Sequence, residues 1–336
     1  MAVLIDAVGA FAADPAGFEA AAVRAEEQGY DGFAVPETAH DPFVSLALAA
    51  RATSRITLQS AIAVAFARNP MTTAMAANDV QLVAGGRFEL GLGSQVRAHI
   101  ERRFGMPWSR PAARMEEYIA TLRAIWARFA TGERLHVEGE FYRHTLMTEF
   151  FDPGPNPHGP PPVLLAAVGE RMTEVAGRVA DGILCHSLTT VDYLREVTVP
   201  ALRRGRGGEL HGFTVCLPVF TVLGDTPEQR AAAEAGVRRQ IAFYASTPAY
   251  RPVLELHGRG ELADRLNKLS RQQAWAEMAG AVDDDLLGAL AVAGDAPAVA
   301  AQLTERYGAL AGRLSLNTPY AVDDAQVLEV AARLRG

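Results

Sequence analysis

Short apolar runs alternate along the chain with longer segments in which hydrophobic residues recur at helical spacing. Gly or Pro stands at most junctions between them, where a chain changes direction. Short runs rich in Val, Ile and Leu are typical of buried parallel strands. The pattern predicts eight strands, at residues 3–8, 32–35, 56–64, 88–92, 163–167, 183–186, 213–223 and 313–316.

Helical segments follow most of these runs. In the segment 111–129, Met115, Ile119, Leu122 and Trp126 recur three or four residues apart, which predicts one buried helical face. Asp14-Pro15 predicts a helix start and Gly29 a helix end. Further helices are expected near residues 42–52, 71–83, 170–180, 191–204, 227–244 and 323–334 and from residue 297 onward.

The segment 55–95 shows the organisation best, because strand, helix and strand follow one another within about forty residues. So short a connection predicts a parallel, right-handed crossover. Its second strand ends in Gly91-Leu92-Gly93, but Val96 occupies the place where a dinucleotide fingerprint needs a third glycine. We therefore interpret the glycines as a strand end where a ligand approaches the backbone.

Eight strands with intervening helices in 336 residues predict an α/β fold, a (β/α)8 TIM barrel with insertions, as one domain over residues 1–336. Residues 132–162 hold aromatics and then prolines, and are expected to form a surface excursion. Residues 249–293 have helical composition and are expected to be an inserted segment. A doubly wound open sheet is the alternative fold.

Composition narrows the classes of function. Hydrophobic residues make up 49% and charged residues 21% of the chain, which is globular composition. The formal charge of −7 argues against nucleic acid as a partner. No export signal or membrane-spanning run is recognisable, and two distant cysteines, Cys185 and Cys216, suggest free buried thiols. We expect a cytoplasmic protein that acts on a small molecule.

In a barrel of this type the chemistry lies at the carboxyl ends of the strands. The residues expected there include Asp6, Glu37, His40, Asp41, Ser60, Ala61, Gly93, Ser94, Gln95, Val168, Gly169, Glu170, His186, Asn317 and Thr318. His186 and Asp6 are placed to meet across the barrel, but no three of these residues have metal-ligand spacing, and we expect no metal. Motifs for acyl or phosphoryl transfer are not recognisable.

Five longer segments carry a family resemblance: EEQGYDGFAVPETAHDPF, IAVAFARNPMTTA, GGRFELGLGSQVRAHIERRFGMPW, PPVLLAAVGERMTEVAGRVADGILCH and FTVLGDTPEQRAAA. Together they resemble the bacterial-luciferase-like monooxygenase superfamily, and within it the coenzyme F420-dependent oxidoreductases of mycobacteria and other actinomycetes. The resemblance covers most of residues 1–230. It does not reach the segment 249–293, which commonly shapes the substrate pocket in this superfamily.

The resemblance implies coenzyme F420, with FMN as the alternative, lying across the barrel mouth. It implies a bulge with a non-prolyl cis peptide at Ser60-Ala61, and an anion site at the start of the helix after Gly169. A fork-like contact from Arg171 is expected to add to that site. The expected cofactor-binding residues are Asp6, Ser60, Ala61, Gly91, Gly93, Ser94, Gln95, Val168, Gly169, Glu170 and Arg171.

The resemblance also implies His40 as the catalytic proton partner, and Glu37 is the alternative acid or base. The glutamate that the family usually carries after the fourth strand is replaced by Gln95 or Val96, which argues against a sugar-phosphate dehydrogenase. The run 99–103 is either a cationic patch for an oligoglutamate tail or an exposed helix face.

Three functions remain open. The first is an F420-dependent oxidoreductase that exchanges hydride with a small organic substrate. The second is an FMN-dependent luciferase-like monooxygenase working with a flavin reductase, and the third is a non-catalytic flavin-binding protein. Family habit suggests a homodimer or a higher homo-oligomer.

Overall fold

Parallel strands close into a barrel in the computed structural model, which describes residues 3–11 and 13–335. In barrel order the strands are β1 (Leu4–Val8), β2 (Gly32–Val35), β3 (Thr57–Ser60), β5 (Phe88–Gly93), β8 (Val163–Ala166), β9 (Gly182–Leu184), β10 (Thr214–Leu223) and β12 (Arg313–Asn317). β1 pairs with β2 on one edge and with β12 on the other, so the sheet has closed. The predicted barrel is confirmed, and the open-sheet alternative is wrong.

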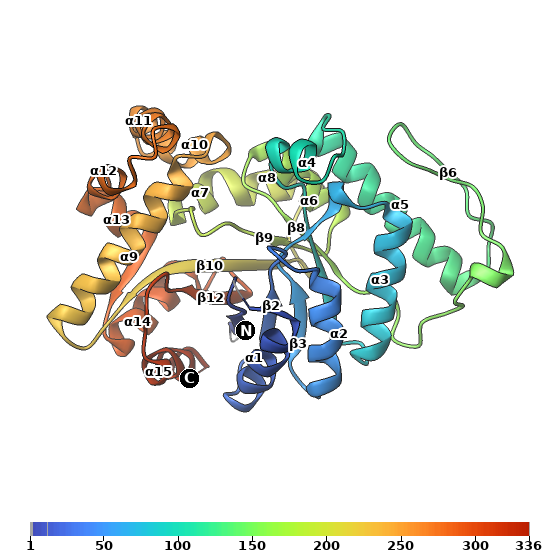
Figure 1. Cartoon of the computed structure of the whole chain (residues 1–336), viewed down its shortest axis with the longest axis horizontal. Helices are drawn as coiled ribbons and strands as arrows, with labels where there is room; N and C mark the ends of the chain where they lie inside the picture. The colour runs from blue at the N-terminus through green and yellow to red at the C-terminus, as the bar shows by residue number, and fades with distance from the viewer. Residues whose placement is uncertain (1–2, 12, 336) are drawn as a thin grey trace.

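Helices surround this barrel (Figure 1). They are α1 (Pro15–Glu27), α2 (Pro42–Ala52), α3 (Pro70–Val83), α4 (Arg97–Arg102), α5 (Pro111–Thr131), α6 (Glu170–Val179), α7 (Val191–Tyr193), α8 (Val199–Arg206), α9 (Pro227–Ala245), α14 (Ala296–Tyr307) and α15 (Asp324–Arg335). A π-helical stretch, η3 (Leu194–Thr198), joins α7 to α8, and a 3₁₀ turn, η1 (Ala65–Ala67), precedes α3. No helix of the described chain is long and apolar enough to span a bilayer.

Several of these helices begin with the same local sequence pattern. Asp14, Asp41 and Asn69 each precede a proline, and each side chain accepts a hydrogen bond from a backbone N–H of the first turn. Thr226 forms a reciprocal capping box with Gln229 at the start of α9. Proline suits the first helical position because its missing N–H would have no partner there. These starts were readable from the sequence because they depend on neighbouring residues alone.

β10 extends beyond the barrel and has two neighbours on one edge. Its first residues pair with β9, whereas Phe220–Leu223 pair with an additional strand, β11 (Ala291–Gly294). Phe220 and Val222 pack against α9 on one face, and Leu217 and Val219 face the α14 side. The sequence reading placed β11 at the end of a helical insertion, which was wrong for these residues. The four residues of β11 show no strand periodicity in the sequence. Their backbone hydrogen-bond partners come from β10.

The two segments that interrupt the barrel pattern differ in structure. Residues 249–290 form four short helices, α10 (Arg251–Leu256), α11 (Gly260–Arg271), α12 (Trp275–Gly280) and α13 (Asp284–Leu290), after a 3₁₀ turn η4 (Pro248–Tyr250). Figure 1 shows α10–α12 gathered beside the upper end of α9. Residues 132–162 contain the hairpin of β6 (Val137–Glu138) and β7 (Arg143–His144) and the 3₁₀ turn η2 (Glu149–Phe151), and Figure 1 shows the hairpin projecting outward.

An ion pair fills the barrel interior where the first and last strands meet. Arg313 donates to both carboxylate oxygens of Asp6, at 2.8 and 2.6 Å, and both residues are buried. A Cβ on Gly32 would lie 2.2 Å from the guanidinium, so only glycine leaves room there. Burial by itself would lower the pKa of Arg313, but the hydrogen bonds and charge of Asp6 outweigh it and raise that pKa.

Replacing Arg313 by Met is expected to destabilise the protein by about 3–5 kcal/mol, because Asp6 would keep a buried charge without a partner. The double replacement Asp6→Leu with Arg313→Met removes both charges and should recover part of that loss. Urea unfolding monitored by circular dichroism measures both values. Arg97→Met is the matched control, since Arg97 pairs with Glu101 on an exposed helix face and should cost less than about 1 kcal/mol. A loss below about 1 kcal/mol in Arg313→Met would contradict this reading.

Candidate active site

The carboxyl ends of the strands surround an open mouth. Successive side chains of a strand alternate between faces, so Val8 points to the same side of β1 as the interior residue Asp6. Val8 is nevertheless 46% exposed, and Phe11, three residues further on, is 63% exposed. Both apolar side chains therefore stand uncovered at the end of β1, where an apolar ring would find contact.

A close backbone crossing shapes one side of this mouth. The Ser60 hydroxyl donates to the carbonyl of Gly91 and accepts from its N–H, both at 2.9 Å, so it joins β3 to β5. A Cβ on Gly91 would lie 1.8 Å from the Ser60 carbonyl oxygen. Ser60 and Gly91 are thus paired with each other, and the glycine allows the two strands to approach closely. Their expected contact with the cofactor stays a prediction.

Beyond Ser60 the chain turns across the mouth as the segment 60–64, which we call the β3 loop. Its non-prolyl cis peptide joins Ala61 to Ile62, one bond later than the predicted Ser60-Ala61 position. Ala61 N–H donates to the Val35 carbonyl, and both Ala61 and Ile62 are half-buried. The interruption splits the expected strand 56–64 into β3 and the short β4 (Ala63–Val64). Ala61 lies at the mouth as predicted.

Glu37 anchors the β3 loop from the neighbouring strand. Its carboxylate accepts from the Val64 N–H at 2.7 Å and from Arg68 at 2.6 Å, and its side chain is 5% exposed. Its own N–H donates to the Ile62 carbonyl. The carboxylate is therefore engaged in holding the loop and in pairing with Arg68, and its expected role as acid or base stays a prediction.

The β5 end presents Gly93, Ser94 and Gln95 beside this loop. A Cβ on Gly93 would lie 2.7 Å from the Ile62 side chain, so this glycine lets the β3 loop pack down on β5. Ser94 donates to the Gln95 carbonyl, and Gln95 adopts a left-handed backbone with a φ of 59°. Both residues are half-buried at the rim, where the sequence placed them.

The start of α6 offers backbone donors to the mouth. Gly169 is its N-cap and makes no side-chain cap, and nothing lies within 4 Å of a Cβ built there. The first hydrogen bond into the helix comes from Thr173, and within the described chain the N–H groups of Glu170, Arg171 and Met172 have no protein acceptor. Such donors favour an anion. Glu170 itself pairs with Arg204, and the Val168 carbonyl accepts from Tyr193.

Asp6 does not belong to this rim. It is the third residue of β1 and lies inside the barrel with Arg313, so the expectation of a cofactor contact is wrong for this residue. It also does not meet His186, whose ring contacts Tyr244 and Tyr250. No group of three or more His, Cys, Asp or Glu residues with metal-binding geometry occurs within residues 3–11 and 13–335.

His40 lies in the exposed loop between β2 and α2. Neighbouring contacts fix this loop: Thr38 donates to the Phe11 carbonyl at 2.8 Å, and Arg103 donates to the Thr38 carbonyl. Asp41 caps α2 and pairs with Arg68. The imidazole is therefore carried on a braced segment next to the uncovered Phe11. Arg103 of the cationic run 99–103 acts here as part of the brace.

A group of rings lies at the mouth beyond β9 and β10, across the barrel from the β3 loop, and His186 is the one of them that the sequence placed at a strand end. The group, which we call the aromatic wall, consists of His186, which follows β9, and of Phe220, Tyr244 and Tyr250, which come from β10, α9 and η4. The His186 ring stacks on Tyr250 with centroids 4.2 Å apart and 19° between planes, and meets Tyr244 edge-on at 4.5 Å. Burial lowers the pKa of His186 to about 4, so its imidazole is neutral near pH 7. The other three rings come from a strand, a helix and a 3₁₀ turn, and no local sequence pattern predicts that they meet His186.

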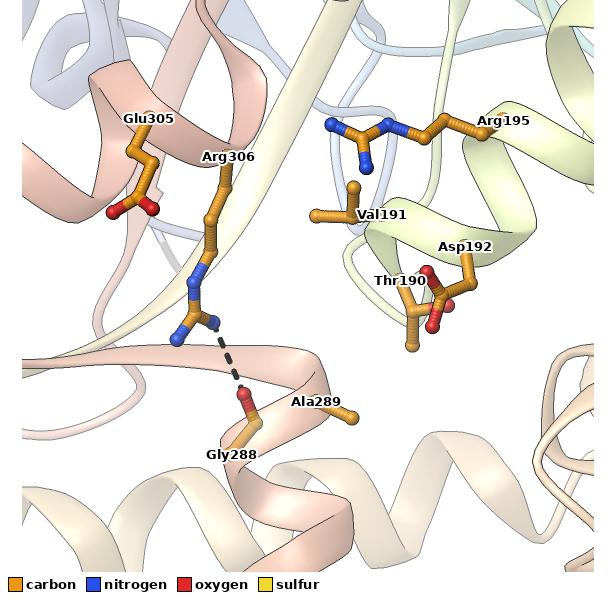
Figure 2. A pocket seen from close by; sticks show the side chains of 8 residues that line it. All are labelled: Thr190, Val191, Asp192, Arg195, Gly288, Ala289, Glu305 and Arg306. Atoms are coloured by element: carbon orange, nitrogen blue, oxygen red, sulfur yellow. Dashed lines mark hydrogen bonds between the residues drawn. The ribbon is translucent and has the colours of Figure 1, made fainter.

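Two cavities lie outside the mouth. One of about 330 Å³ opens between α7, η3, α13 and α14, and Arg195 and Arg306 line it from different elements (Figure 2). Arg306 there donates to the Gly288 carbonyl, closing the end of α13. The other, of about 470 Å³, lies between α9 and α12. Both cavities lie away from the β3 loop and the α6 start, so they do not alter the site described here.

The residues of the mouth fit a flat ring with an anionic tail. The α6 start supplies unsatisfied N–H donors for an anion, and the β3 loop and the exposed Val8 and Phe11 supply apolar surface. The two thiols are free, and burial raises the pKa of Cys185 to about 12, so neither is a ready nucleophile.

Comparison with known proteins agrees with this architecture. The chain is 49% identical to the uncharacterised protein Rv1360 of Mycobacterium tuberculosis over 297 residues, 88% of this chain and 87% of that protein. The coenzyme F420-dependent tetrahydromethanopterin reductase of Methanopyrus kandleri superposes with a TM-score of 0.79 at 20% identity, over 99% of this chain and 97% of that one.

A second solved structure has the same fold. The oxygenating constituent of 3,6-diketocamphane monooxygenase from Pseudomonas putida, in complex with FMN, superposes with a TM-score of 0.67 at 18% identity, covering 99% and 97% of the two chains. The profile of the family described as luciferase-like monooxygenase matches residues 6–313. The protein therefore belongs to the luciferase-like monooxygenase family.

Proposed function

We propose that the protein is an F420-dependent oxidoreductase that transfers a hydride between the deazaflavin ring and a small organic substrate. The observation that carries the proposal is the open mouth between the β3 loop and the uncapped start of α6. The M. kandleri structure, described as F420-dependent, shares this fold and supports the choice of cofactor. A homodimer or higher homo-oligomer remains part of the proposal.

In this proposal one set of residues binds the cofactor and another residue transfers the proton. Ala61, Ile62 and Gly93 present the surface on which the ring would rest, and Ser94 and Gln95 border it. The N–H groups of Glu170, Arg171 and Met172 would hold a phosphate of the cofactor, with the Val168-Gly169 turn setting their direction. A bound deazaflavin supplies a two-electron hydride donor or acceptor. His40 would exchange the accompanying proton with the substrate oxygen.

FMN in the same mouth is the second candidate, and it would make the protein a monooxygenase that depends on a flavin reductase. The P. putida structure in complex with FMN favours this alternative, because it shares the fold. The mouth contacts described above are mostly backbone and apolar groups, which suit either tricyclic ring. The two functions are therefore distinguished by binding and turnover, and the next experiment is designed for that purpose.

The protein is titrated separately into F420 and into FMN. In the first titration, F420 fluorescence is expected to be quenched with a Kd below about 10 μM, which corresponds to a binding free energy of about 7 kcal/mol. FMN is expected to bind at least tenfold more weakly. A cofactor-dependent rise in Tm supplies an independent measure, since a selective ligand stabilises the folded state by mass action. Selective FMN binding would replace the first function by the second, and failure of both ligands would remove both.

Gly169→Asp is expected to weaken binding of the phosphate-bearing cofactor at least tenfold, because a carboxylate at the α6 N-cap would repel the anion and occupy its donors. Gly169→Asn is the matched control, since it caps the helix without the charge and should bind more tightly than Gly169→Asp. The backbone of Gly169 has an ordinary extended φ of −72°, so neither variant should lower Tm. Equal affinities of the two variants would argue against a phosphate at this helix start.

His40→Ala is expected to lower kcat by about 10²–10⁴-fold while the cofactor Kd stays unchanged, because proton transfer is lost and the ring contacts are kept. The control is His136→Ala, on the approach to the outer hairpin, which should leave kcat unchanged. Turnover is followed through the absorbance of the reduced and oxidised cofactor. Full activity of His40→Ala would exclude His40 from the proton transfer.

A further inference from the structure

The aromatic wall contains one polar atom whose orientation the fold determines. We infer that His186 is a substrate-binding residue whose Nε2–H donates a hydrogen bond to the oxygen of a compact, uncharged carbonyl compound or of its alcohol. The inference rests on the function proposed above and adds the substrate class. It concerns the end of β9, the strand next to β8, which leads into α6, and it assigns no part of the cofactor site.

The strand register places His186 above the barrel interior. Leu184 pairs with Cys216 and packs with it and Leu164 inside the barrel, beside Ala61 and Ile62. Cys185 continues the pairing through its N–H to the Cys216 carbonyl at 2.9 Å. Because strand side chains alternate, His186 lies on the same face as Leu184, one level nearer the mouth.

Contacts on β10 agree with that placement. Phe220 lies on the same face of β10 as Cys216, at the level of Asn317, the last residue of β12. Phe220 packs against Tyr244 with centroids 6.2 Å apart, and Tyr244 in turn touches His186. Asn317 donates to the Ser187 hydroxyl at 2.7 Å, which ties the residue after His186 to the same end of the barrel. His186 therefore stands at the mouth, facing the β3 loop.

A backbone hydrogen bond determines which ring nitrogen carries the proton. The Leu188 N–H donates to His186 Nδ1 at 3.0 Å. Nδ1 must then be an acceptor, so the neutral ring carries its proton on Nε2. Within residues 3–11 and 13–335, Nε2 has no hydrogen-bonded protein partner, and it is also absent from the enclosed polar atoms that lack one. A donor is thus left facing accessible space.

The surroundings of the ring select an uncharged ligand. Stacking against Tyr250 and edge contact with Tyr244 hold the imidazole in one plane, so the donor direction is fixed before any ligand arrives. Burial is the sole cause that lowers the pKa of His186, and no charged group contributes to the shift. A carboxylate placed there would lack a counter-charge, and an ammonium group would meet a donor. A carbonyl oxygen accepts the N–H, and its apolar body suits the rings.

The hydrogen bond fits the chemistry of the proposed reaction. In reduction, the carbonyl carbon gains a hydride from the reduced cofactor, the carbonyl oxygen gains a proton through His40, and the product is the alcohol. His186 neither gains nor loses a proton. Its N–H bond strengthens as negative charge develops on the oxygen, so it would stabilise the transition state as well as the bound substrate.

The test uses full-length protein with selectively ¹⁵N-labelled histidine, with and without the cofactor that it binds. Long-range ¹⁵N–¹H spectra at pH 7 should show the Nε2–H tautomer for His186, identified as the signal missing in His186→Gln. Addition of cyclohexanone should shift that signal. Cyclohexanecarboxylate and cyclohexylammonium, which have the same ring but carry a charge, should leave it in place. The Nδ1–H tautomer, or a response to a charged probe only, would overturn the inference.

Two substitutions separate the donor from the packing. His186→Asn retains an acceptor for the Leu188 N–H but loses the outer donor, and should weaken cyclohexanone binding about tenfold, which is one hydrogen bond. His186→Gln can place an amide N–H near the Nε2 position and should stay within about threefold of wild type. Both should keep the wild-type Kd for the cofactor. Equal ketone affinity in His186→Asn and wild type, or no ketone binding by the wild type, would refute the proposal.

The outcome is distinguishable from failure of the proposed function. Loss of both F420 and FMN binding in the wild type would remove the oxidoreductase, but the tautomer and the ketone response would still be measured in the protein alone. Conversely, a protein that binds F420 and shows no effect of His186→Asn on ketone binding would retain its proposed function without this residue.

Discussion

The buried pair of Asp6 and Arg313 is the constraint on which the barrel depends. It joins β1 to β12, the two ends of the sheet, inside a space that Gly32 keeps open. Two charges in a barrel interior are expensive to desolvate and become acceptable only with full, bidentate pairing. The pair therefore fixes the register in which the first and last strands meet, and all other strands are positioned by that closure.

Close pairing between distant residues also shapes the mouth. Ser60 and Gly91 bring two backbones so close that no side chain fits between them, and Glu37 holds the following turn through Val64 and Arg68. They determine where Ala61 and Ile62 stand, and a rigid support of this kind is what keeps a flat ring in one position relative to a reacting atom. Ser60, Gly91 and Glu37 thus support the loop that borders the proposed site.

The two sides of the mouth have different origins. The side with the β3 loop and the α6 start is built from the repeating strand–helix units, and its contacts are mainly backbone groups. The aromatic wall depends on the segment after α9, since Tyr250 lies in η4, and His257, the C-cap residue of α10, forms a hydrogen bond with Thr190 at 2.8 Å. The segment 249–290 therefore contributes to the aromatic wall, whereas the β3 loop and the α6 start depend on the strand–helix units alone.

The sequence by itself determined the elements and their order. Cap residues, prolines and apolar periods act between neighbours in the chain, so the eight barrel strands and the start of α1 could be read directly. The positions of Gly169, Ala61 and His40 near strand ends were also predictable, because the barrel rule places every such end at one face. β11 was not predicted, because the strand edge with which it pairs exists only where β10 extends beyond the end of β9.

Only the tertiary structure decided what each rim residue does. Asp6, Ser60, Glu37 and Gly91 look like ligand contacts along the chain, yet each is engaged by a group at least 27 positions away. The wall around His186 needs rings at positions 220, 244 and 250, which come from three other elements. Such roles depend on which polar groups remain unpaired after folding, and pairing over that distance is a property of the packed barrel, which no local pattern records.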